Sequence, residues 1–150
     1  MEKYLINTTV TIYLIDIAEI NIVANFYTIN DVIEEASNLR NVKIDIRLME
    51  SNNVDLTETP LLKYLSETDL KLLQTAKSHD MVLVTDDKKL AKVAKINNVR
   101  IIDTPRLIST MAFNGSVQYN TAREMLKRLD IIYNRKQIVK KTLQDLEEWR

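Results

Sequence analysis

The stretch Met81-Val-Leu-Val-Thr-Asp-Asp87 places four apolar residues, then a threonine and two carboxylates, in immediate succession. A short apolar run of this kind predicts a buried strand. A helix from about Asp87 should follow, because Leu90, Val93 and Ala94 lie on one helical face. A buried strand that leads into a helix is the unit of a parallel α/β sheet, so this stretch decides the fold class.

The pattern of strand and helix continues on both sides of this stretch. Apolar, β-branched or strictly alternating runs predict four further strands, at residues 3–6, 22–28, 42–48 and 99–102. Residues 10–20 are apolar on nearly every side and predict a well-buried helix. Amphipathic spacing and polar N-caps predict helices from about Asn30, at 58–65 with Pro60 in the first turn, and from Ser66. The sequence therefore predicts an α/β three-layer sandwich with a central, largely parallel sheet, whose alternating strand 42–48 lies at an edge.

The C-terminal part of the chain is expected to be helical. Two helices, roughly 119–132 and 136–149, follow a turn at Asn114-Gly115. We expect residues 1–110 to form the α/β domain and residues 111–150 to form a helical extension of the same domain. The two helices carry an apolar stripe that includes Met125, Leu129, Ile132, Ile138, Val139, Leu143 and Leu146. This stripe predicts a homodimer, unless it covers the sheet of its own chain.

Composition excludes several classes of site. The chain has no cysteine, a single histidine (His79) and a single glycine, which leaves no thiolate metal site, no ligand set for structural zinc and no glycine-rich phosphate loop. No apolar run approaches the roughly 18 residues of a membrane helix, and the first residues lack the pattern of a signal peptide. We therefore expect a cytoplasmic protein without a membrane partner.

Overall charge does not indicate a nucleic-acid partner, because 21 basic side chains balance 21 acidic ones. Acidic side chains outnumber basic ones over residues 1–110, and the reverse holds over residues 111–150. This asymmetry is either chance variation between helices or an acidic pocket beside a basic rim. Four lysines that follow Asp87 have the same two interpretations, a solvated helix face or a contact to an RNA backbone: Lys88, Lys89, Lys92 and Lys95.

Polar side chains stand where predicted strands end or helices begin. Asn7 follows the first strand, Asp86 follows the strand at 81–84, and Glu35 and Asp69 lie early in their helices. We expect these four side chains to converge at the carboxyl edge of the sheet, where α/β proteins bind ligands. Clustered oxygen ligands of this kind bind Mg²⁺ or Mn²⁺. Like charges should then raise the pKa of Asp69 or Asp86 when no metal is bound.

Helix capping is the alternative use of the same residues. Ser66-x-x-Asp69 has the spacing of a capping box, and Asp86 or Asp87 is a favourable N-cap. Glu35 would then be a solvated helix residue. The residues alone leave both interpretations open.

Four stretches, in order, resemble the motifs of the PIN-domain ribonucleases over about residues 3–105. They are Leu5-Ile-Asn-Thr-Thr9, Thr28-Ile-Asn-Asp-Val-Ile-Glu-Glu35, Leu65-Ser-Glu-Thr-Asp69 and Val84-Thr-Asp-Asp87. The resemblance implies metal-dependent hydrolysis of RNA by clustered acids that bind one or two Mg²⁺ or Mn²⁺ ions.

The resemblance also implies roles for individual residues. Glu35, Asp69 and Asp86 would be catalytic metal ligands, and Asp87 an additional ligand. Glu35 is preferred to Glu34 because an apolar helix residue follows it. Two threonines would orient the acids: Thr8 and Thr85.

The first motif departs from the family at Asn7, where the family has an aspartate. An amide oxygen can coordinate a hard cation but brings no negative charge. The resemblance therefore leaves two interpretations. One is an RNA-processing nuclease weakened by Asn7, for which the toxin half of a toxin–antitoxin pair, with an antitoxin protein as partner, is one form. The other is a catalytically inactive PIN scaffold that binds RNA or protein.

Overall fold

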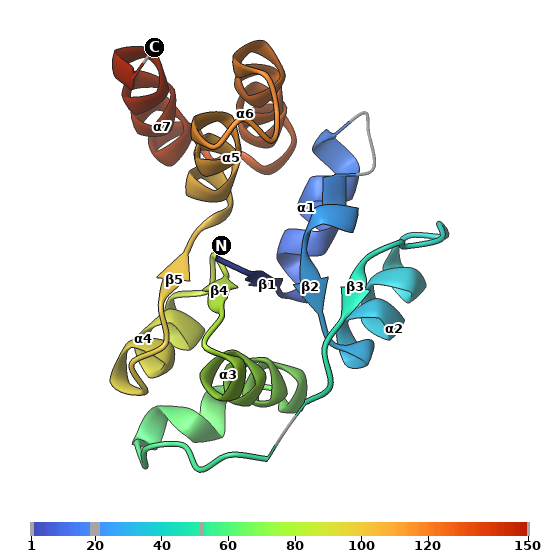
Figure 1. Cartoon of the computed structure of the whole chain (residues 1–150), viewed down its shortest axis with the longest axis vertical. Helices are drawn as coiled ribbons and strands as arrows, with labels where there is room; N and C mark the ends of the chain where they lie inside the picture. Colours follow the sequence, from blue (N-terminus) through green and yellow to red (C-terminus); the bar gives the residue numbers. More distant parts are fainter. Residues whose placement is uncertain (1, 19–21, 52, 150) are drawn as a thin grey trace. The chain divides into compact units, whose positions relative to one another are not determined.

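The protein is described here by a computed structural model covering residues 2–18, 22–51 and 53–149. The chain forms two compact units, Met1–Ile102 and Asp103–Arg150. The first unit contains a sheet with helices, and the second is helical (Figure 1).

Unit 1 is built on a five-stranded, fully parallel sheet with the order β3-β2-β1-β4-β5. Its strands are β1 (Tyr4–Ile6), β2 (Tyr27–Thr28), β3 (Arg47–Leu48), β4 (Val82–Val84) and β5 (Ile101–Ile102). The predicted α/β sandwich with a parallel central sheet is confirmed, with β3 at an edge. From β1 the chain runs outward to β3 and then returns to place β4 on the other side of β1. The strand order therefore reverses between β1 and β4, which is where open α/β sheets bind ligands.

The helices described in unit 1 are α1 (Thr8–Ile17), the 3₁₀ helix η1 (Ile22–Asn25), α2 (Asn30–Leu39), the 3₁₀ helix η2 (Pro60–Tyr64), α3 (Glu67–His79) and α4 (Lys88–Ile96). Three of the α-helices begin with a polar side-chain cap, whereas α2 follows Ile29 and has none. Asn7, Ser66 and Asp87 cap α1, α3 and α4 with their side chains. Pro60 stands at the start of η2, as expected, because a proline there removes no helical hydrogen bond.

All five strands are shorter than the sequence suggested, and two of them lose most of their predicted length. Residues 22–25 form the 3₁₀ helix η1, and only Tyr27 and Thr28 of the segment 22–28 pair with the sheet. Ile22 and Val23 are buried in that turn, so burial alone accounts for their apolar character. In the segment 42–48 only Arg47 and Leu48 pair. The predicted helix 10–20 begins earlier, at Thr8, and ends at Ile17, and residues 19–20 lie outside the described residues.

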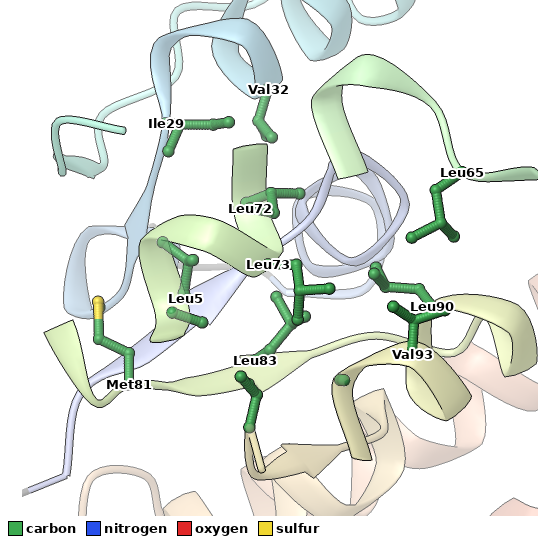
Figure 2. Close-up of a cluster of buried hydrophobic side chains, with 13 residues drawn as sticks. Leu5, Ile29, Val32, Leu65, Leu72, Leu73, Met81, Leu83, Leu90 and Val93 are labelled. Atoms are coloured by element: carbon green, nitrogen blue, oxygen red, sulfur yellow. The ribbon is translucent and has the colours of Figure 1, made fainter. Parts of the chain in front are cut away.

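The core of unit 1 joins the central strands to α2, α3 and α4 (Figure 2). Leu5 of β1 and Leu83 of β4 lie on one face of the sheet, where Leu72 and Leu73 of α3 and Leu90 of α4 pack. Alternation along a strand turns Ile6, Val82 and Val84 toward the opposite face, and they are also buried. Both faces of β4 are therefore covered, which explains its uninterrupted apolar sequence.

Unit 2 contains one helix that the sequence analysis did not predict. It has α5 (Thr104–Phe113), α6 (Tyr119–Tyr133) and α7 (Lys136–Trp149). The carboxylate of Asp103 accepts a hydrogen bond from the Arg106 N–H at 2.9 Å, and Pro105 stands in the first turn. Asp103-Thr-Pro was thus an available helix-start signal. The expected domain limit at residue 110 lies inside α5.

The apolar stripe of α6 and α7 is largely buried in the structure. Met125, Leu129, Val139 and Leu146 are buried, whereas Ile131 and Ile132 are 82% and 50% exposed. The single glycine, Gly115, has a positive φ of 80° in the turn before α6, a conformation that disfavours other residues. None of the helices in the described segments is long and apolar enough to cross a membrane.

The burial of β4 predicts the consequence of truncating it. Leu83→Ala should lower the free energy of unfolding by about 2–5 kcal/mol, because it leaves a cavity beside a side chain with 0% exposure. Leu48→Ala, at the sheet edge and 55% exposed, is the matched control and should change it by about 0.5 kcal/mol or less. Urea denaturation measures both. Equal losses in the two variants would contradict the assigned core.

Candidate functional site

The register of the two central strands places Asn7 beside Thr85. Ile6 pairs with Val84, so the next residue of each strand leaves the sheet at the same edge. The amide Nδ2 of Asn7 donates a hydrogen bond to Thr85 Oγ1 at 3.0 Å, and the two residues are only 6% and 3% exposed. This buried bond connects β1 to β4 where the strand order reverses.

Asn7 also caps the first helix. Its Oδ1 accepts a hydrogen bond from the Val10 N–H at 2.9 Å. The donor end and the acceptor end of the amide are therefore both engaged within the protein. Helix capping accounts for an asparagine at position 7. The second lone pair of Oδ1 is the only one left to coordinate a cation.

Thr85 fixes the backbone that carries the two aspartates. Its Oγ1 accepts a hydrogen bond from the Asp87 N–H at 3.0 Å, and the Asp87 carboxylate in turn accepts from the Lys89 N–H at 2.9 Å. Asp87 is therefore the N-cap of α4, one of the two caps expected. Asp86, half-buried, lies between Thr85 and Asp87 and is carried by the same turn.

Glu35 connects three helices. Its Oε2 accepts a hydrogen bond from the Thr8 hydroxyl at 2.6 Å, and its Oε1 accepts from the Thr68 hydroxyl at 2.5 Å. Thr8 and Thr68 lie in the first turns of α1 and α3, so the carboxylate of α2 is held between two helix starts. Glu34 instead accepts a hydrogen bond from the Asn30 side chain within its own helix.

Thr68 is the site residue that the sequence analysis missed. It lies inside Ser66-Glu-Thr-Asp69, a stretch in which the serine and the aspartate have the spacing of a capping box. The available signal was its position next to Asp69 in the first helical turn. Its partner Glu35 is 33 residues away in sequence, so local spacing could not reveal the contact.

Asp69 is the carboxyl group whose ionisation the site disfavours. Burial, the largest cause, raises its pKa, and the charges of Asp87 and Glu35 raise it further, while a hydrogen bond with the Ser66 side chain acts in the opposite direction. The expected upward shift is therefore present at Asp69, although burial contributes more than like charge. Ser66 Oγ accepts from the Asp69 N–H at 3.0 Å, so the predicted cap at Ser66 exists as well.

The carboxylates interact but do not form a closed metal cage. Among the residues that the structure describes, no three side chains of histidine, aspartate or glutamate form a group that could hold a metal ion. Mg²⁺, however, usually retains several waters and binds to proteins through one or two carboxylates. The oxygen-only donors around Asp69 fit a hydrated hard cation of that kind.

Neither a protein-family model nor a curated protein matches the sequence of this chain. The case for a function therefore rests on the motifs and on the geometry of the site.

The raised pKa of Asp69 gives a testable dependence of stability on pH. Between the ordinary and the raised pKa, the folded chain keeps a proton that the unfolded chain has released, so the free energy of unfolding falls as pH rises. Asparagine does not ionise. The stability of Asp69→Asn relative to the wild type should therefore increase as pH rises from about 3 to about 7.

Urea denaturation at several pH values checks this expectation. Glu67→Gln is the matched control, because Glu67 lies in the same helical turn with a side chain that is 85% exposed. It reports the effect of removing a charge near the N-terminus of α3. A relative stability of Asp69→Asn that stays constant or falls with rising pH would contradict the assigned surroundings of Asp69.

Proposed function

We propose that this protein is a PIN-type ribonuclease that hydrolyses RNA phosphodiester bonds with Mg²⁺ or Mn²⁺. The observation that carries the proposal is the meeting of three acidic segments where the strand order reverses. Glu35, Asp69 and Asp87 come from distant parts of the chain, and the charges of Glu35 and Asp87 both act on Asp69. All four quoted motifs contribute to this one place.

Capping alone does not account for the arrangement. An N-cap requires one acceptor at one helix start, and Asn7, Ser66 and Asp87 already serve α1, α3 and α4. Asp69 and Glu35 are additional carboxylates, and repulsion from the charge of Glu35 adds to the burial that raises the pKa of Asp69. A bound cation would offset that repulsion, which makes the cluster understandable as a binding site.

The residues divide the work in a simple way. Asp69, Asp86, Asp87 and Glu35 would hold the cation, which when bound supplies neutralising charge for the phosphodiester and a more acidic water. Thr8 and Thr68 fix the orientation of Glu35 through their hydroxyl groups. The hydrogen bond between Asn7 and Thr85 holds together the ends of the two central strands, next to which Asp86 and Asp87 follow in the chain.

A non-catalytic module that binds RNA or protein on the same scaffold is the second candidate. Asn7 favours it, because both ends of its amide are engaged inside the protein and it adds no negative charge. The absence of a closed group of metal ligands among the described residues is compatible with it. The two candidates differ in one measurable property, which is turnover of RNA.

A toxin role with an antitoxin partner, and a homodimer, are narrower proposals. Ile131 and Ile132 are adjacent exposed apolar side chains on α6 that a second copy could cover. Sedimentation of the purified chain would test the dimer, since a monomer at micromolar concentration would exclude it.

Cleavage of a mixed single-stranded RNA pool in Mn²⁺ tests the proposed activity. Asp69→Asn should abolish it, and Thr68→Val should reduce it by about 10- to 100-fold, because a partner that orients a metal ligand typically contributes that much. Thr75→Val is the matched control. Thr75 lies in the same helix and donates within it to the Lys71 carbonyl, away from the acids. No metal-dependent cleavage by the wild type would favour the binding module.

Asn7→Asp tests whether the site lacks only one charge. In EDTA the variant should melt at a lower temperature, because it loses the donor to Thr85 and buries a carboxylate beside other acids. Mn²⁺ should then raise its melting temperature more than that of the wild type, by about 1.4 kcal/mol of stability per tenfold gain in affinity.

Asn7→Ser is the control for the second experiment, because serine keeps a capping oxygen without adding a charge. It should show no gain in its response to Mn²⁺. If Asn7→Asp responds to the metal no more than Asn7→Ser does, position 7 is not part of a cation site.

A further inference from the structure

Tyr64 presents an exposed aromatic ring between two lysines. The ring belongs to η2 and is 59% exposed. The ammonium group of Lys63 lies 5.1 Å from the ring centroid, and that of Lys89 lies 5.5 Å from it. No core packing explains an aromatic residue with this much exposure, whereas its position between two cations is well defined.

This trio is built on the same segments as the acidic site. Tyr64 stands two residues before Ser66, the cap of the helix that carries Asp69. The backbone N–H of Lys89 donates to the Asp87 carboxylate, while its side chain reaches Tyr64. η2 also packs against α4. The trio therefore adjoins the helix starts that carry Asp69 and Asp87.

We propose that Tyr64, Lys63 and Lys89 form a subsite that holds one nucleotide of a single-stranded RNA beside the acidic site. The base stacks on the ring of Tyr64, and the two ammonium groups contact the neighbouring phosphates. The proposal rests on the proposed function, and it adds where the substrate strand lies and what holds it there.

Charge complementarity is the reason for this occupant. The acidic cluster repels phosphates, so a nucleic acid that reaches it needs a source of positive charge close by. Lys63 and Lys89 are flexible and exposed, and they can exchange the ring face for a phosphate when a base arrives. Stacking on an aromatic ring tolerates every base, which suits a strand read by its backbone and not by its sequence. A duplex offers no unstacked base to the ring, so the subsite selects single strands.

Binding of a short fluorescein-labelled single-stranded RNA of mixed sequence, in EDTA so that no metal-dependent cleavage occurs, tests the subsite. Tyr64→Leu should weaken binding by about 5- to 150-fold, the usual effect of losing one base-stacking ring. Tyr64→Phe keeps the ring and should bind within about twofold of the wild type.

The lysines are tested by the salt dependence of the same binding. The double variant Lys63→Gln/Lys89→Gln should reduce the slope of log affinity against log salt by about 1.4, since each lost phosphate contact to a single strand removes about 0.7. Lys95→Gln, at the opposite end of α4, is the matched control and should leave the slope unchanged.

The outcomes separate the two proposals. If the wild type binds or cleaves RNA and Tyr64→Leu binds as tightly as Tyr64→Phe, the subsite is wrong and the proposed function stands. If the wild type neither binds nor cleaves single-stranded RNA, both are wrong. Weaker binding by Tyr64→Leu with retention by Tyr64→Phe supports the subsite even if the protein proves to be a non-catalytic binder.

Discussion

The pairing of β1 with β4 is the constraint on which the rest of the site depends. Ile6 lies opposite Val84, and this register alone brings Asn7 to Thr85. A slip of one residue would exchange the side chains that pack on the two faces of the sheet and would break the Asn7–Thr85 bond. Thr85 then holds the Asp87 N–H, so the position of the α4 acids is set by the strands and not by the loop that carries them.

The strand register fixes the segment that carries Asp86 and Asp87, and two threonine hydroxyl groups fix the position of Glu35. Thr8 and Thr68 bind the two oxygens of Glu35 and so join α2 to the starts of α1 and α3. These bonds hold Glu35 close enough to Asp69 for its charge to add to the burial that raises the pKa of Asp69. A carboxyl group whose pKa is raised by burial and by neighbouring charges is a feature that is enriched at functional sites.

The sequence allowed the parallel α/β fold to be predicted because local patterns carry it: the apolar run at β4, the cap at Ser66 and the amphipathic α6 and α7 are readable residue by residue. It did not allow the tertiary choices to be predicted. Ile22 and Val23 bury their apolar side chains in the 3₁₀ helix η1, and composition cannot distinguish such a turn from a strand. The hydrogen bond from Thr68 to Glu35 joins residues 33 positions apart in the sequence. The bond from Asn7 to Thr85 joins residues 78 positions apart.

The long separation between Asn7 and Thr85 also sets an order in time. On the ribosome, Asn7 is synthesised before its partner Thr85, which follows only after 78 more residues have been added. At about 5–20 residues per second, several seconds pass during which the nascent chain holds the early segments but no assembled site. The edge of the sheet where the strand order reverses can therefore be completed only after most of unit 1 has been synthesised.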